Sequence, residues 1–259
     1  MRRGYVDTSL GQVHYREAGQ GPVLLLLHQT AESSRMYTEV MPLFAQAFRV
    51  IATDTPGFGE SDKPTTPPSM ADYARCMFEA LDRLDVRTAS ILGHHTGASI
   101  AVEMAASQPD RVQKLVLSGC PDYEPEARAE KLKNVAPASL AADGSHFAKA
   151  WGRVAPYRTG WATTEQTDRA AQDTLKAGPN YYFAYVAVFS YDVRARIPSI
   201  TAPTLLLGGE TDTLTARLPL IQPLFRKADL HVFKGSGSLP LNEIPQTFVD
   251  RVRAFLTAP

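Results

Sequence analysis

The sequence predicts an α/β protein, built on a mostly parallel sheet flanked by helices, with a helical cap inserted late in the chain. Short apolar runs of strand length alternate with segments of helical periodicity, which is typical of consecutive β–α–β units. Residues 23–27 are apolar throughout, as expected for a strand buried on both faces of a parallel sheet. The alternation stops at about residue 121 and resumes at about residue 200.

Each expected element has a local signal. Residues 12–17 alternate between polar and apolar side chains after a Leu10-Gly11 turn, which indicates a strand. An amphipathic helix is expected after the proline-rich loop 64–68, and a first helix is expected in spite of Pro42. The expected strands are 12–17, 23–27, 49–53, 89–92, 114–118, 204–207 and 230–233, and the expected helices are 34–47, 70–84, 98–108 and 245–256.

The interval 121–199 differs from the rest of the chain. It is helix-prone, charged at first and aromatic later, with Trp151, Tyr157, Trp161 and Tyr185 among its rings. This aromatic content argues against a long disordered loop. We therefore expect residues 1–120 and 200–259 to form the core and residues 121–199 to form a helical cap over the edge of the sheet.

Composition excludes several classes of function. The 259 residues are 44% apolar, carry no formal net charge and contain two cysteines. A nucleic acid, an anionic membrane or a disulfide framework is therefore not expected. No apolar run approaches the roughly 20 residues of a spanning helix, and the N-terminus lacks the apolar core of a signal peptide. We expect a cytoplasmic protein with a small-molecule substrate and no cofactor or metal; its oligomeric state stays open, a homodimer included.

The most informative segment is Gly93-His94-His95-Thr96-Gly97. It joins an expected strand to an expected helix and has glycines two residues before and two residues after its centre. This is the pattern of a nucleophile elbow, a strained turn that exposes its central side chain above the sheet. Glycine is needed at the flanking positions because a Cβ there would collide with the strand and helix. The central residue is His95, where such turns usually have serine.

With these elements in order, the chain resembles the α/β-hydrolase superfamily over essentially its whole length. The elbow, Leu27-His28-Gln29-Thr30, residues 54–62, residues 209–212 and residues 235–245 carry the resemblance. It implies that Asp212 is the acid of a catalytic triad. It also implies that the backbone N–H groups of Thr96 and Thr30 are the oxyanion-hole donors.

The chain departs from the family pattern at two positions. His95 stands where a serine is expected, and Ser238 stands where a histidine is expected, while Asp212 keeps the acid position. The residue types of a Ser-His-Asp triad are therefore present with two of them exchanged. Chemistry requires only their geometry, so an exchanged triad is feasible. We expect a hydrogen bond of about 2.6–3.2 Å between His95 Nε2 and Ser238 Oγ.

The exchange raises two questions. The acid Asp212 is expected to orient the late-loop residue and to lie far from His95 Nδ1, so Glu210, Asp122 or Asp54 are alternative partners for the imidazole. The second question is the oxyanion hole. Its amides are placed for attack from the elbow, whereas attack from Ser238 would form the oxyanion elsewhere.

Three functions stay open at this point. Ser238 could be the nucleophile of a hydrolase with His95 as its base. His95 could instead act as a general base without a covalent step. The enzyme would then be a hydrolase, lyase or decarboxylase that cleaves an ester, a lactone or a C–C bond of a small carbonyl substrate. The chain could also be an inactive binding protein of the same fold. The residues expected to line the substrate pocket are Gln29, Asp122, Trp151 and Tyr185.

Overall fold

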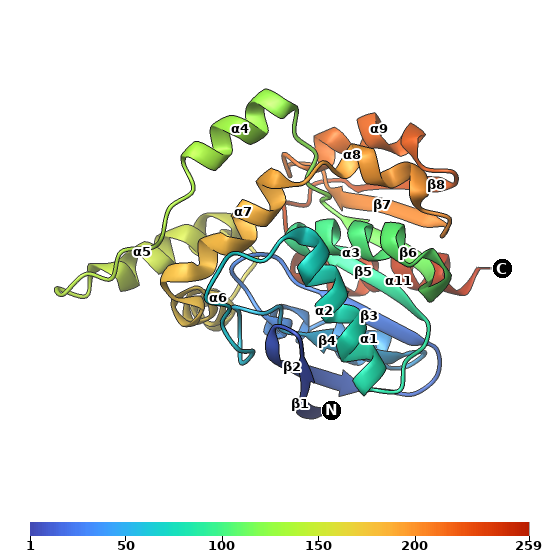
Figure 1. The fold of residues 1–259 in the computed structure, drawn as a ribbon, viewed down its shortest axis with the longest axis horizontal. Helices are drawn as coiled ribbons and strands as arrows, with labels where there is room; N and C mark the ends of the chain where they lie inside the picture. Colours follow the sequence, from blue (N-terminus) through green and yellow to red (C-terminus); the bar gives the residue numbers. More distant parts are fainter. Residues whose placement is uncertain (259) are drawn as a thin grey trace.

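The computed structural model describes residues 1–258, and its centre is an eight-stranded sheet in the order β1-β2-β4-β3-β5-β6-β7-β8 (Figure 1). The two pairs that involve β2 are antiparallel, and every other pair is parallel. The predicted fold class is therefore confirmed. The strands are β1 (Arg2–Thr8), β2 (Gly11–Ala18), β3 (Val23–Leu27), β4 (Arg49–Thr53), β5 (Ala89–His94), β6 (Val112–Ser118), β7 (Thr204–Gly209) and β8 (Ala228–Phe233).

Helices cover both faces of the sheet. The central strand β3 sends Leu25 and Leu27 into one apolar cluster and Leu24 and Leu26 into the other. The first cluster is closed by α2 (Met70–Arg83) and α3 (Thr96–Ser107), and the second by α1 (Met41–Phe44) and α11 (Pro245–Thr257). Burial on both faces explains why the strand reads as an uninterrupted apolar run.

One expected helix was wrong, and one strand was missed. The helix expected over residues 34–47 is divided into a 3₁₀ turn, η1 (Ser34–Tyr37), and α1 (Met41–Phe44). Pro42 lies in the first turn of α1, because a proline has no N–H to donate and is tolerated only at a helix start. Strand β1 was not expected at all. Its side chains are exposed or half-buried at the edge of the sheet, so they carry little hydrophobic signal.

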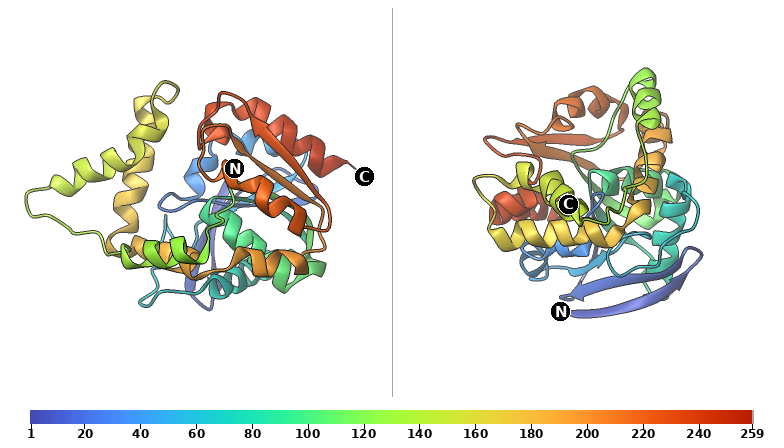
Figure 2. Two further views of the ribbon diagram at one scale, coloured as in Figure 1. Left: turned by 90° about the horizontal axis from the view of Figure 1, so that it is seen from above. Right: turned by 90° about the vertical axis from the view of Figure 1, so that its left-hand side faces the viewer.

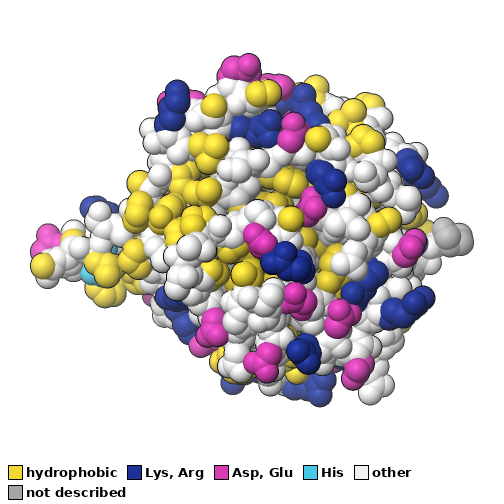
Figure 3. Space-filling view, in the orientation of Figure 1, with side chains coloured by type: hydrophobic (Ala, Val, Ile, Leu, Met, Phe, Trp, Pro, Cys, Tyr) yellow, Lys and Arg dark blue, Asp and Glu magenta, His cyan; other side chains and the backbone are white. Residues whose placement is uncertain are grey.

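Between β6 and β7 the described chain is helical and contains no strand. This interval extends to one side of the sheet (green to orange in Figure 2). Its helices are α4 (Pro125–Lys133), α5 (Ser145–Val154), α6 (Thr164–Ala177), α7 (Phe183–Ser190) and α8 (Val193–Arg196), with the 3₁₀ turns η3 (Ala155–Arg158), η4 (Pro179–Tyr182) and η5 (Ile197–Ser199). Hydrophobic side chains gather where α7 meets the core, while charged side chains of both signs are scattered over the core helices (Figure 3).

Ion pairs connect the helices of this interval to the core. Arg35 Nη1 lies 3.0 Å from Asp173 Oδ1 on α6, and Arg169 Nη2 lies 2.5 Å from Glu39 Oε1. These pairs hold α6 over the loop that follows β3. Within residues 1–258, no helix combines the length and the apolar character needed to cross a membrane.

Candidate active site

The turn between β5 and α3 has the geometry of a nucleophile elbow. His95 has φ 49° and ψ −112°, a left-handed conformation that is strained for a residue with a side chain. A Cβ on Gly93 would lie 2.2 Å from the carbonyl oxygen of Gly97, and one on Gly97 would lie 2.0 Å from that of Leu27. Both glycines are therefore required by the close approach of β5, α3 and β3.

The His95 imidazole is bonded to Asp212, on the loop that follows β7. His95 Nε2 lies 3.0 Å from Asp212 Oδ2, and the exposed fractions of the two side chains are 19% and 5%. The other carboxylate oxygen, Oδ1, accepts a hydrogen bond from the Leu214 amide at 3.1 Å. The carboxylate is thus fixed from both sides and holds the ring in one orientation.

This contact corrects the expected hydrogen-bond pattern. Among residues 1–258, no hydrogen bond joins His95 to Ser238, and His95 Nε2 meets the carboxylate instead. Asp212, which was expected to lie far from Nδ1, meets the other ring nitrogen instead, because the ring reaches from the elbow to the loop after β7. Ser238 nevertheless lines the same cavity as His95 and Asp212.

The alternative acids for His95 are all engaged elsewhere. Asp122 forms ion pairs with Arg194 and Arg217 at 2.7 and 3.0 Å. Glu210 Oε2 accepts a hydrogen bond from the Gly235 amide at 2.9 Å. Asp54 Oδ2 lies 2.8 Å from His14 Nδ1, and Oδ1 accepts from the Ser34 amide. None of these three carboxylates is therefore the partner of His95.

A cavity of about 340 Å³ opens above His95 and Asp212. Two residues expected in the pocket, Gln29 and Tyr185, line it. Two others do not: Asp122 is buried in its ion pairs, and Trp151, on α5, is 40% exposed. The full lining comprises Gln29, Thr30, Ala31, Glu32, His95, Tyr123, Arg153, Val154, Tyr157, Arg158, Thr174, Tyr185, Asp212, Thr213, Leu214, Ser238 and Leu239.

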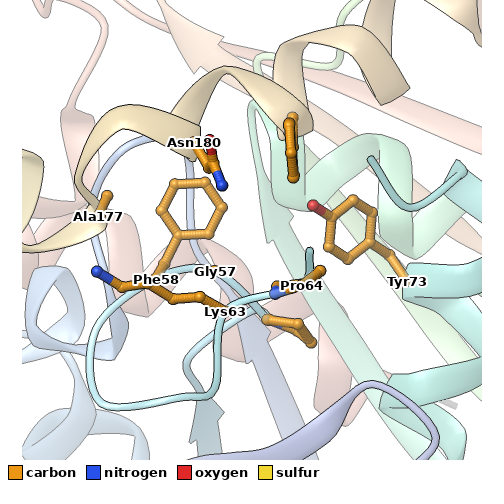
Figure 4. Close-up of a pocket in the computed structure, with 9 residues that line it drawn as sticks. Gly57, Phe58, Lys63, Pro64, Tyr73, Ala177 and Asn180 are labelled. Atoms are coloured by element: carbon orange, nitrogen blue, oxygen red, sulfur yellow. The ribbon is translucent and has the colours of Figure 1, made fainter. Parts of the chain in front are cut away.

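A separate hollow of about 10 Å³ lies between the loop after β4 and the end of α6. Figure 4 shows the rings of Phe58 and Tyr73 on its wall, with Asn180 above them. This volume accommodates about one water molecule, and the hollow contains none of the candidate site residues.

The two expected oxyanion donors lie close together. Within the described chain, the Thr96 amide, at the first position of α3, has no hydrogen-bond partner. The Thr30 amide donates to the Thr96 hydroxyl at 3.4 Å, a long hydrogen bond. Tyr185 Oη donates to the Thr30 carbonyl at 3.4 Å. A free amide at a helix N-terminus is suited to hold developing negative charge.

The two nitrogens of the His95 ring have different surroundings. A Cβ on Gly119 would lie 2.5 Å from His95 Cδ2 and 2.6 Å from Nε2, so this edge of the ring packs against Gly119. In an imidazole, Nδ1 is the atom opposite that edge. Because a carboxylate can only accept, Nε2 of the neutral ring donates to Asp212, and the lone pair is then on Nδ1.

A second histidine supports the first. The ring of His94 stacks on that of His95 with centroids 4.1 Å apart, and His94 Nδ1 lies 2.9 Å from Ser118 Oγ. Burial, then the His95 ring, then the Arg158 cation lower the pKa of His94 well below its usual value. His94 therefore stays neutral and packs as a flat wall behind His95.

Several site residues had no recognisable signal in the sequence. Gly119 follows β6 directly, and its contact with His95 arises because β6 pairs with the elbow strand β5. Glu32 and Arg158 line the cavity as an ion pair, although 126 residues separate them. Tyr123 also lines the cavity, and burial raises its pKa to about 12, which keeps its hydroxyl protonated.

Parts of this chain are similar in sequence to known proteins. A bifunctional epoxide hydrolase 2 of Mus musculus is 33% identical over 140 residues, which are 51% of this chain and 25% of that protein. An uncharacterized protein of Mycobacterium tuberculosis is 40% identical over 103 residues, 40% of this chain and 30% of that protein. The matched segments thus span less than a third of these relatives.

A solved structure of a hydrolase from Pseudomonas aeruginosa PA01 superimposes with a TM-score of 0.84 at 27% identity, covering 99% of this chain and 98% of that chain. The model of the alpha/beta hydrolase fold family matches residues 22–241, which include the elbow, the Asp212 loop and Ser238. The chain therefore belongs to the alpha/beta hydrolase fold family.

Proposed function

We propose that this protein hydrolyses a small carbonyl substrate, such as an ester or a lactone, with His95 as the general base. The observation that carries the proposal is the 3.0 Å hydrogen bond between His95 Nε2 and Asp212 Oδ2 beside a cavity of about 340 Å³. It leaves His95 Nδ1 as the basic atom. The names of the relatives, an epoxide hydrolase and a hydrolase, support a hydrolytic reaction.

The proposed reaction requires no covalent intermediate. A water molecule hydrogen-bonded to His95 Nδ1 gives up a proton as its oxygen attacks the substrate carbonyl carbon. The carbonyl oxygen becomes an oxyanion, which the backbone N–H groups of Thr96 and Thr30 stabilise. Collapse of this intermediate breaks the bond to the leaving group, which takes the proton back from Nδ1. Asp212 stabilises the transient imidazolium by accepting its Nε2 proton in a hydrogen bond.

A second candidate is nucleophilic attack by Ser238. Its support is that Ser238 lines the same cavity as His95. Against it, His95 Nε2 is already bonded to Asp212, so activation of the serine would require Nδ1 to face Oγ. Lyase or decarboxylase chemistry with His95 as the base, and an inactive binding protein, remain as further alternatives to be separated by experiment.

The test is a screen of esters, lactones and thioesters with matched variants. We expect His95→Ala to lower kcat/KM by about 10²–10⁴-fold, the usual contribution of a general base, with the Tm changed by only a few degrees. Asp212→Asn should also lower kcat/KM, because the amide favours the wrong tautomer of the His95 imidazole. Ser238→Ala should retain activity, and a serine-directed phosphonate should not label the protein.

Other outcomes have definite meanings. Labelling at Ser238 together with loss of turnover in Ser238→Ala would replace this mechanism by the covalent one. Full activity in His95→Ala would contradict both. Absence of turnover for every ester, lactone and thioester would favour the inactive binding protein.

A further inference from the structure

The cavity above His95 contains a buried ion pair. Glu32, on the loop after β3, and Arg158, in η3, both line it, and Arg158 Nη2 lies 2.8 Å from Glu32 Oε1. Their side chains are only 7% and 5% exposed. Removing two charges from water is unfavourable, and their mutual attraction repays it only when the geometry is good and the remaining polar atoms are bonded. A buried pair at the wall of a substrate cavity is therefore a candidate for binding specificity.

The pair has unused hydrogen-bonding capacity. Glu32 Oε1 accepts from Arg158 Nη2 and from Gln29 Nε2, and Arg158 Nη1 donates to the Val154 carbonyl at 3.3 Å. Within residues 1–258, Glu32 Oε2 and Arg158 Nε have no hydrogen-bond partner, yet neither atom is sealed from solvent. One free acceptor and one free donor thus belong to neighbouring side chains.

The charge of the pair limits what it can bind. An anionic group would be repelled by the Glu32 carboxylate, and a cationic group by the Arg158 guanidinium. A neutral hydroxyl fits both, because its oxygen accepts from Arg158 Nε while its proton is donated to Glu32 Oε2. An apolar group at the same place would leave both charged side chains incompletely paired, which is unfavourable in a buried site.

We propose that Glu32 and Arg158 form a subsite that selects substrates carrying a hydroxyl group. This inference rests on the proposed function, in that the subsite belongs to the same cavity as His95. The loop that contributes Glu32 also carries the Thr30 amide, and η3 contributes Arg158 from the other side of the cavity. The subsite therefore forms only where the cap interval meets the core.

The kinetic test compares esters that differ by one hydroxyl. Ethyl 3-hydroxybutyrate is paired with ethyl butyrate, and 2-hydroxyethyl butyrate with propyl butyrate, so that either side of the scissile bond is probed. We expect kcat/KM to favour the hydroxylated member of at least one pair by about tenfold or more, since a site built to bond a hydroxyl rejects the analogue without it. Equal kcat/KM within both pairs would overturn the proposal.

The variants must preserve the fold. A single Arg158→Met leaves Glu32 buried without its partner and is expected to destabilise the protein, whereas replacement of both charges by apolar side chains of similar length is often tolerated. The Glu32→Met/Arg158→Met double variant should therefore remain folded and lose the preference for the hydroxylated ester. Arg169→Met is the control, because it removes another ion pair with the core, to Glu39, outside the cavity. A preference retained in the double variant would contradict the assignment.

Binding separates this proposal from the proposed reaction. Titration of the full chain with 3-hydroxybutyramide and butyramide, followed by NMR chemical shifts, requires no turnover. We expect at least about tenfold tighter binding of the hydroxylated amide, and loss of that difference in the double variant. If no ester is hydrolysed but this difference is seen, the reaction is wrong and the subsite stands. Equal binding of the two amides would reject the subsite.

Discussion

At the scale of single residues, the site depends on how far a histidine reaches from the elbow. A serine hydroxyl at this position would lie one bond beyond Cβ, whereas the His95 imidazole extends to Asp212 and meets its carboxylate at 3.0 Å. In the family pattern, a histidine on the late loop contacts the acid. Here His95 makes that contact from the elbow, and Ser238 occupies the position of the late-loop histidine.

Gly119 is the residue against which this contact is packed. Its φ is +61°, and a Cβ would lie 2.5 Å from His95 Cδ2 and 2.7 Å from Asp212 Oδ2. We expect Gly119→Ala to displace the imidazole from the carboxylate and to reduce kcat/KM strongly, with about 1 kcal/mol of stability lost to the left-handed backbone alone. Enzyme kinetics and chemical denaturation measure the two effects.

Gly235→Ala is the matched control for this substitution. Gly235 has φ +74°, but a Cβ there would meet nothing within 4 Å. It should show the backbone strain without the loss of activity. Equal effects of the two substitutions on kcat/KM would argue that Gly119 matters only for its backbone conformation.

At the scale of elements, the elbow is held by the contact between α3 and β3. The Thr96 amide begins α3, so the position of this helix sets the position of the proposed oxyanion donor. Gly97 lies against the Leu27 carbonyl at the end of β3, where backbone atoms on both sides leave no room for adjustment. The geometry of the site is therefore a property of strand-to-helix packing.

We expect Gly97→Ala to destabilise the protein by at least about 2 kcal/mol and to lower activity, because its Cβ would lie 2.0 Å from the Leu27 carbonyl oxygen. Gly152→Ala, in the last turn of α5, is the contrasting change, since a Cβ there meets nothing within 4 Å. It should stabilise the protein by up to about 1 kcal/mol, the difference in helix propensity. Urea denaturation of both variants gives their free energies of unfolding. Similar changes in the two variants would contradict the argument that Gly97 is required by packing.

At the scale of the whole molecule, buried neutral histidines link stability to pH. Burial, then the His95 ring and the Arg158 cation lower the pKa of His94 well below its usual value, and burial also lowers the pKa of His28. His28 is held neutral by its bonds, since Nε2 accepts from the Thr55 amide at 2.9 Å and Nδ1 donates to the Gln29 carbonyl at 2.8 Å. Unfolding below about pH 6.5 allows both rings to take up protons.

The free energy of unfolding should therefore fall as the pH is lowered below about 6.5, and His94→Asn should reduce this dependence. The sign follows from the pKa, which is lower in the folded state than in the unfolded chain, so that acid favours unfolding. Burial raises the pKa of Asp173 to about 6, so protonation of this carboxyl stabilises the folded state as the pH falls. This contribution is the same in the wild type and in His94→Asn, so it cancels when their slopes are compared. Chemical denaturation from pH 8 to pH 5 measures the slopes; identical slopes would show that His94 does not contribute.

Local patterns determined most of the fold. The strands Val23–Leu27 and Arg49–Thr53 agree with the expected ranges, because continuous apolar runs reflect burial on both faces of the sheet. The elbow was recognisable from its two glycines, since close backbone approach leaves no other residue type available. Edge strand β1 escaped prediction because its exposed side chains carry no such pattern.

The sequence by itself determined the fold class and the placement of His95 at the turn, because both follow from the spacing of nearby residues. Only the tertiary structure decided which acid meets the imidazole, since 117 residues separate His95 from Asp212. The same is true of the Glu32–Arg158 pair, which forms across the boundary between the core and the inserted helices. Side chains so distant along the chain are brought together by packing, and no local spacing encodes that distance.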